Sequence, residues 1–151
     1  PLDVVRVPVP DDLHVALVTP KHELMTREAR AILPSHVSLG ALVRNSAALA
    51  AFVSACYSGD MALLARAIPD EIVTPARAML IPGCHEVMDA ALDVGALGSG
   101  ISGAGPTMFA LCRSRVSAAR SAVAMAKAFK AAGLESTTII SPADAPGARV
   151  R

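Results

Sequence analysis

Residues 98–107, with the sequence Gly-Ser-Gly-Ile-Ser-Gly-Ala-Gly-Pro-Thr, hold four of the ten glycines of this chain. Glycine adopts positive φ without steric cost and places no side chain between the backbone and a ligand. The segment lies between a helical pattern and a strand-like run, so we expect a shaped loop whose amides face a ligand; a plain glycine-rich turn is the alternative. No Gly-Lys-Ser/Thr follows, and a strand rather than a helix comes next. These two features exclude a Walker phosphate loop and a dinucleotide-binding fingerprint.

Length and composition indicate one folded domain. The chain has 151 residues, 53% of them hydrophobic and 18% charged, which is enough to build a core and excludes a disordered chain. The net charge of +1 and the scattered basic residues predict no nucleic-acid partner. The mean hydropathy of +0.48 raises the possibility of a membrane span. Residues 94–112 are uncharged but contain five glycines and Pro106, and residues 45–59 are too short. We therefore expect no membrane partner and, with no signal peptide visible, a cytoplasmic location.

The cysteines do not form a metal-binding pattern. Cys56, Cys84 and Cys112 are odd in number and widely spaced, which is typical of reduced, buried residues. Cys84 and His85 are neighbours, but no second Cys/His pair follows at the spacing of a zinc site. We expect no metal site in this chain.

Hydrophobic periodicity predicts an α+β fold, with a small, mostly antiparallel sheet and helices packed on one face. Strands are expected at 13–19, 107–112, 137–140 and 147–151, and helices from about Thr26 to Leu33 and over 38–57, 60–66, 71–80, 82–94 and 116–132. Thr26 is the expected N-cap of its helix. The helix over 38–57 has a single charge, Arg44, so we expect it at the centre of the core.

The helix over 116–132 is predicted to bury one stripe. Ala118, Ala122, Met125 and Phe129 recur at helical spacing, whereas the basic residues of the segment fall outside that stripe. Gly133 is expected to end the helix.

Two arginines stand out as candidate anion ligands. Arg30 follows Thr26 by one helical turn, and Arg77 lies in another short helix between prolines. A guanidinium group binds a carboxylate through a planar fork of donors, so two converging arginines suit an amino-acid substrate. Arg27 competes with Arg30 for this role. From the residues alone, each arginine is more often a solvated surface charge.

The glycine-rich segment resembles the third motif of the small-molecule kinases named after galactokinase, homoserine kinase, mevalonate kinase and phosphomevalonate kinase, the GHMP kinases. Its form is most similar to that of the homoserine kinases. Three further stretches agree with that family in the same order, at 26–34, 75–83 and 145–150. The resemblance implies that residues 1–151 are the ferredoxin-like C-terminal domain of such a kinase.

The same resemblance implies roles for individual residues. Arg30 and Arg77 would hold the carboxylate of L-homoserine, and Thr26 would place its hydroxyl near the transferred phosphate. Arg30 is preferred to Arg27 because the family pattern has the arginine one turn after the threonine. The active-site loop would comprise Gly98, Gly100, Ser102, Gly103, Ala104 and Gly105. No catalytic residue is expected in this chain.

The family's ATP-binding element, a Pro-x-x-x-Gly-Leu-Gly-Ser-Ser-Ala-like loop, has no counterpart in the sequence. We therefore expect that ATP and Mg²⁺ bind mainly to an N-terminal kinase domain that this sequence does not contain, and that this domain is a partner of the chain. A homodimer is a further expectation. The complete protein would phosphorylate the side-chain hydroxyl of L-homoserine in threonine biosynthesis, and the isolated chain would be inactive. Two alternatives stay open: a related kinase of mevalonate or isoprenoid precursors, and a non-catalytic α+β regulatory module.

Overall fold

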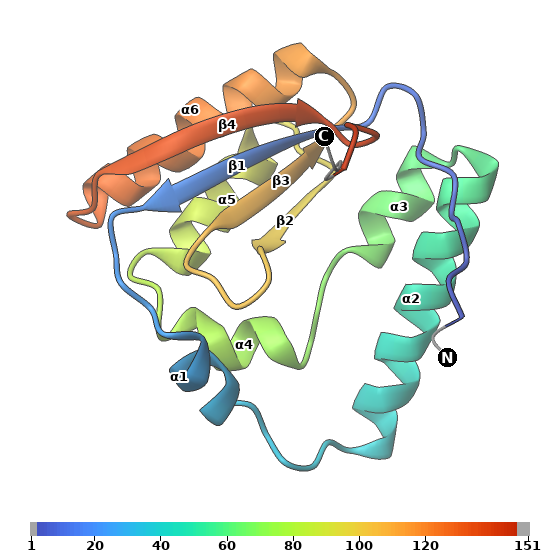
Figure 1. Cartoon of the computed structure of the whole chain (residues 1–151), viewed down its shortest axis with the longest axis horizontal. Helices are drawn as coiled ribbons and strands as arrows, with labels where there is room; N and C mark the ends of the chain where they lie inside the picture. The colour runs from blue at the N-terminus through green and yellow to red at the C-terminus, as the bar shows by residue number, and fades with distance from the viewer. Residues whose placement is uncertain (1–2, 148–151) are drawn as a thin grey trace.

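A four-stranded antiparallel sheet forms the centre of the molecule (Figure 1). The computed structural model describes residues 3–147. In chain order the strands are β1 (His14–Pro20), β2 (Gly98–Ile101), β3 (Met108–Cys112) and β4 (Ser136–Pro142), and their spatial order is β2-β3-β1-β4. With a helical connection after β1 and another after β3, this is the ferredoxin-like arrangement. Residues 148–151 of the strand predicted at 147–151 lie outside the described residues.

Side-chain alternation in the two central strands creates one apolar face. Ala16 of β1 pairs with Ala110 of β3 and with Ile140 of β4. Ala16, Val18 and Ala110 are fully buried, as expected for the face of a sheet that helices cover.

Two long helices cover that face, as the sequence predicts. They are α5 (Cys84–Asp93) and α6 (Arg115–Ala131). The predicted stripe of α6 is confirmed, because Ala118, Ala122, Met125 and Phe129 are all buried against the sheet and α5. Ser114 begins α6 with a reciprocal cap in which its side chain accepts the Ser117 N–H.

The remaining helices lie below the sheet and to its right in Figure 1. They are α1 (Thr26–Ala31), α2 (Leu39–Ser58), α3 (Met61–Ala67) and α4 (Val73–Ala78). The predicted N-cap is wrong by one residue: Met25 has the extended backbone of a cap, and Thr26 is already helical. The Thr26 side chain therefore makes no cap hydrogen bond, and the residue is exposed.

The prediction that α2 is central to the core is wrong. Of its twenty residues only Ala55 and Cys56 are buried, and both lie near its C-terminus. Leu39 is 77% exposed and Leu49 is 65% exposed. Apolar residues occur all around this helix, so their pattern does not show which face is covered. By length and composition alone, with a mean hydropathy of 1.4, α2 also passes the criterion for a membrane span.

The cysteines agree with the sequence interpretation. Cys56, Cys84 and Cys112 are free thiols, and all three are buried. Burial, together with the negative charge of Glu86, raises the pKa of Cys84 to about 11. A buried thiol with so high a pKa is inert, which fits a packing role.

Candidate functional site

The glycine-rich segment is partly a strand. Gly98 and Gly100 lie in β2 rather than in a loop, which corrects their predicted position. A Cβ atom on Gly98 would come within 2.5 Å of Ile68 Cδ1, and one on Gly100 within 3.0 Å of the Phe109 ring. Packing of these neighbours on the edge strand, rather than ligand approach, accounts for both glycines.

The loop itself covers residues 102–107, here named the glycine loop. It is closed by two backbone hydrogen bonds, from Ser102 N–H to Thr107 O at 2.8 Å and from Gly105 N–H to Ser102 O at 3.0 Å. The hydroxyls of Thr107 and Thr19 lie 2.9 Å apart, which ties the loop to β1. Within residues 3–147 no acceptor meets the N–H groups of Gly103 or Ala104. The loop therefore presents two adjacent amides at its tip, as an anion-binding turn does.

Two glycines of the loop have different roles. Gly103 and Gly105 both have positive φ, of +60° and +83°. Nothing lies within 4 Å of a Cβ built on Gly103, so the tip is open. A Cβ on Gly105 would lie 3.0 Å from Ile81 Cδ1 and 3.4 Å from Leu24 Cδ2. The base of the loop is therefore packed and its tip is not.

Arg77 of α4 joins the three segments that the sequence singled out. Its Nε donates to Ala29 O of α1 at 2.9 Å, and its Nη1 donates to Gly103 O of the glycine loop at 2.7 Å. Thr26, Arg30 and Arg77 thus belong to elements that meet, although 48 residues separate Arg77 from Ala29.

Two side chains outside the predicted site residues hold the α4 segment in place. The carboxylate of Asp70 accepts the N–H groups of Ile72, Val73 and Thr74 at 2.6–3.0 Å. Burial alone would raise the pKa of Asp70, but these donors outweigh it and leave the pKa below its usual value. Beyond the other end of the helix, His22 Nε2 donates to Leu80 O at 3.0 Å. An acidic residue just before a helix signals such a cap, whereas nothing in the sequence signals the histidine contact.

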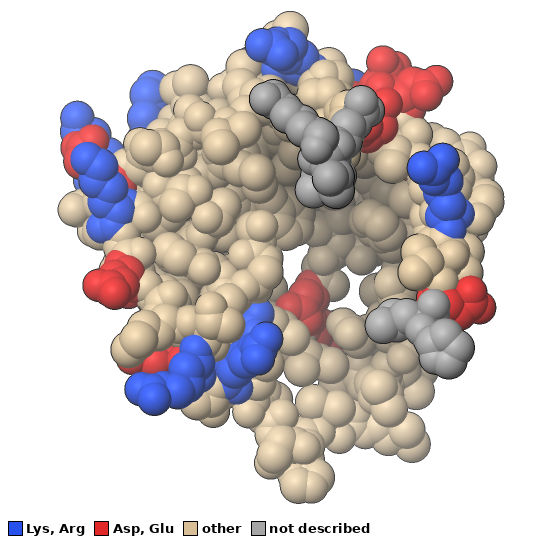
Figure 2. Space-filling view, in the orientation of Figure 1, with Lys and Arg blue, Asp and Glu red and all other residues tan. Residues whose placement is uncertain are grey.

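The charge of Arg77 is not neutralised inside the described part of the chain. Both of its acceptors are uncharged carbonyl groups, and the one ion pair within residues 3–147 joins Arg44 to Glu71. Arg30 is exposed on α1, one turn from Thr26. Figure 2 shows basic side chains over α1 and α4 at the lower left of the view, and further basic side chains at the upper left, the top and the right.

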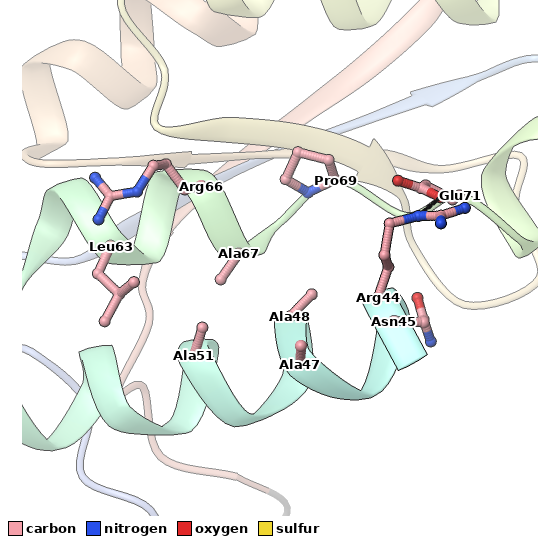
Figure 3. Close-up of a pocket in the computed structure, with 10 residues that line it drawn as sticks. All are labelled: Arg44, Asn45, Ala47, Ala48, Ala51, Leu63, Arg66, Ala67, Pro69 and Glu71. Atoms are coloured by element: carbon pink, nitrogen blue, oxygen red, sulfur yellow. Dashed lines mark hydrogen bonds and ion pairs between the residues drawn. The ribbon is translucent and has the colours of Figure 1, made fainter. Parts of the chain in front are cut away.

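Two cavities among the described residues are lined by residues outside this cluster. One of about 350 Å³ separates α2 from α3, where small side chains such as Ala48 and Ala67 face each other (Figure 3). A second, of about 450 Å³, lies between α2 and the sheet. In the cluster around Arg77, Thr26, Arg30 and Gly103 are exposed and Arg77 is half-buried.

Comparison with known proteins identifies the family. The family described as "GHMP kinases C terminal" matches residues 48–131, more than half of the chain. The chain belongs to the GHMP kinase family. The predicted resemblance and the predicted α+β fold are both confirmed, and membership of a kinase family implies the use of ATP.

Within this family the chain is similar to several homoserine kinases. The homoserine kinase of Chlorobium phaeovibrioides is 41% identical over 152 residues, which cover 99% of this chain and 48% of that protein. The crystal structure of homoserine kinase from Cytophaga hutchinsonii superimposes with a TM-score of 0.91 at 41% identity, covering 92% of this chain and 44% of the other. The mevalonate kinase of L. major shares the fold alone, at 16% identity and a TM-score of 0.62 over 93% of this chain and 45% of its own. The chain therefore spans about half the length of the relatives it matches.

Proposed function

We propose that this chain is the C-terminal, substrate-binding half of an ATP-dependent homoserine kinase, which phosphorylates the side-chain hydroxyl of L-homoserine in threonine biosynthesis. The observation that supports this most is the unneutralised guanidinium of Arg77, held between α1 and the glycine loop. It lies in a chain that is 41% identical to a homoserine kinase over nearly its whole length.

The carboxylate of the amino acid would bind to Arg30 and Arg77. An arginine has five N–H donors, and the bonds to Ala29 O and Gly103 O use two of those on Arg77. Both N–H groups of Nη2 stay available, because no acceptor meets them within residues 3–147. Arg30 is preferred to Arg27 because Arg30 lies on the same helix face as Thr26. Arg27 directly follows Thr26, and adjacent residues of a helix do not face the same way.

The amides at the tip of the glycine loop would face the transferred phosphate. Phosphoryl transfer depends mainly on positioning and on stabilising the negative charge of the transition state. The N–H groups of Gly103 and Ala104, with the hydroxyl groups of Ser102 and Thr26, are donors of the required kind. No residue of this chain is assigned as a base.

We propose that the described residues, 3–147, supply only part of the ATP and Mg²⁺ site. The glycine loop leads into a strand, so it lacks the helix N-terminus that holds a phosphate in nucleotide-binding loops. No cluster of three carboxylate, histidine or cysteine side chains that could hold a metal occurs within residues 3–147. We place the contacts to Mg²⁺ and most of those to ATP on an N-terminal domain.

That domain is also the partner we propose for the bare apolar surface of α2. Leu39, Leu42 and Leu49 are each at least half exposed, which is unusual for so many leucines on one helix. We further propose a cytoplasmic protein that binds neither nucleic acid nor membrane; a homodimer is compatible with this arrangement.

The proposal is tested by ADP release from the longer protein that contains this chain, with L-homoserine or mevalonate as acceptor. We expect release with homoserine, and none from the 151-residue chain alone. Release with mevalonate but not homoserine would contradict the substrate. Turnover by the chain alone would contradict the assignment of the ATP site to another domain.

A further inference from the structure

We propose that Arg77 is a positioning residue: it holds the tip of the glycine loop against α1 and thereby fixes the separation between the loop amides and the Thr26–Arg30 face. The expected effect on catalysis rests on the proposed function. The expected effect on the position of the glycine loop does not. Binding the substrate carboxylate requires only that free N–H donors of the guanidinium face the substrate. The structure gives Arg77 two neutral backbone acceptors on two different elements as well.

The first acceptor belongs to a helix that has little support of its own. α1 has six residues, and its N-cap residue makes no side-chain hydrogen bond. A helix this short is marginal without outside contacts. At the C-terminal end of α1, the carbonyl groups of Glu28 and Arg30 accept backbone N–H groups of Ile32 and Leu33. The carbonyl of Ala29, a buried residue, accepts the Nε–H of Arg77 instead.

The second acceptor lies at the unsupported part of the glycine loop. The base of the loop packs at Gly105 on Ile81 and Leu24, but the tip at Gly103 has open space around it. Within residues 3–147, the hydrogen bond from Arg77 Nη1 to Gly103 O is the one hydrogen bond that another element makes to Gly103 or Ala104. Loss of this bond would free the amides of Gly103 and Ala104 to move relative to α1.

The planar guanidinium explains why an arginine is needed here. Its Nε and Nη1 donors point in different fixed directions, so one rigid group can bridge Ala29 O and Gly103 O at 2.9 and 2.7 Å. A lysine would keep the positive charge, but its single ammonium group cannot reproduce both directions. A lysine variant therefore separates the two hydrogen bonds of Arg77 from its positive charge.

The test is amide hydrogen exchange in the longer protein, comparing Arg77→Lys and Arg77→Ala with the unchanged enzyme. The reporters are the Ser102 and Gly105 amides, which are protected by bonds inside the glycine loop. We expect both variants to exchange at least about tenfold faster there, because a hydrogen bond from a charged donor is lost. Amides of α6 should be unchanged, which distinguishes local opening from unfolding. Arg30→Lys and Arg30→Ala are the matched controls, because Arg30 is exposed and makes no such bond. They should leave loop exchange as it is.

Kinetic measurements show whether the position of the loop that Arg77 fixes matters for catalysis. With L-homoserine, Arg77→Lys should lower kcat as well as raise KM, because the loop amides act in the transition state. Arg30→Lys should mainly raise KM. Loop exchange within about twofold of the unchanged enzyme in both Arg77 variants would overturn the proposal. Equal acceleration by the Arg30 variants would overturn it as well. If the protein does not act on homoserine at all, the exchange result still decides the structural part, so the two failures are distinguishable.

Discussion

Single residues of the glycine loop differ in what they contribute, although they look equivalent in the sequence. Gly103 has a positive φ, but a Cβ at its position would meet no neighbour. Gly105 has a positive φ and also lies where a Cβ would crowd its neighbours. Gly98 and Gly100 need only the space, because Ile68 and Phe109 pack where a Cβ would be. The same residue type thus serves backbone geometry at the tip and packing at the edge strand.

This difference predicts two distinct costs of substitution. Gly103→Ala should lower the free energy of unfolding by about 1 kcal/mol, the cost of a strained positive φ. Gly105→Ala should cost at least about 2 kcal/mol, because steric overlap with Ile81 and Ile101 adds to the same backbone strain. Urea denaturation of the chain measures both. A Gly105→Ala variant as stable as Gly103→Ala would contradict the close packing at the base of the loop.

The burial of a helix could be predicted from the sequence where its apolar residues recur with a clear helical period, and not where they occur all around the helix. The stripe of α6 fixed both the helix and its orientation, because Met125 and Phe129 fall on one face at helical spacing. The all-round apolar pattern of α2 predicted a helix correctly but its burial wrongly. The contact of Arg77 with Ala29 could not be predicted, because the acceptor is a backbone carbonyl that any residue could supply.

At the same scale, α4 depends on Asp70 for its start. The formal N-cap, Ile72, has no side-chain acceptor, so the Asp70 carboxylate takes three N–H groups of this turn instead. Asp70→Ala should lower the free energy of unfolding by about 1 kcal/mol at pH 7. Asp89→Ala, at an exposed position of α5, is the control and should stay within about 0.5 kcal/mol of the unchanged chain.

The Asp70 effect should depend on pH in one direction. Because the folded-state pKa is lowered, the carboxylate stabilises the fold fully above its unfolded pKa of about 3.9 and loses that contribution as the pH falls through the folded pKa. The gap between the unchanged chain and Asp70→Ala should therefore be constant from pH 5 to 7 and shrink at pH 3. Urea denaturation at these three values tests this, and a gap that widens at pH 3 would contradict the ionic cap.

For the whole molecule, we propose that the arrangement is one half of an interdomain site. Gly103 is exposed and Arg77 is half-buried, and the two cavities beside α2 are lined by other residues. The chain also spans about half of its relatives, 48% of the Chlorobium enzyme. Because the ATP-binding loop is missing from the sequence, the motif resemblance predicts a further, N-terminal domain, and this stays a prediction. The sequence could not predict that α2 leaves so much apolar surface bare.

The central claim is that cationic side chains of α1 and α4 select a substrate carboxylate, and calorimetry tests it most directly. The longer protein would be titrated with L-homoserine and with 3-aminopropan-1-ol, which has the same amino and hydroxyl groups but no carboxylate. We expect homoserine to bind at least about tenfold more tightly, as charge-assisted hydrogen bonds are worth roughly 1.5–3 kcal/mol. Arg30→Ala should narrow that difference. Equal affinity for the two amino alcohols in the unchanged protein would contradict the claim.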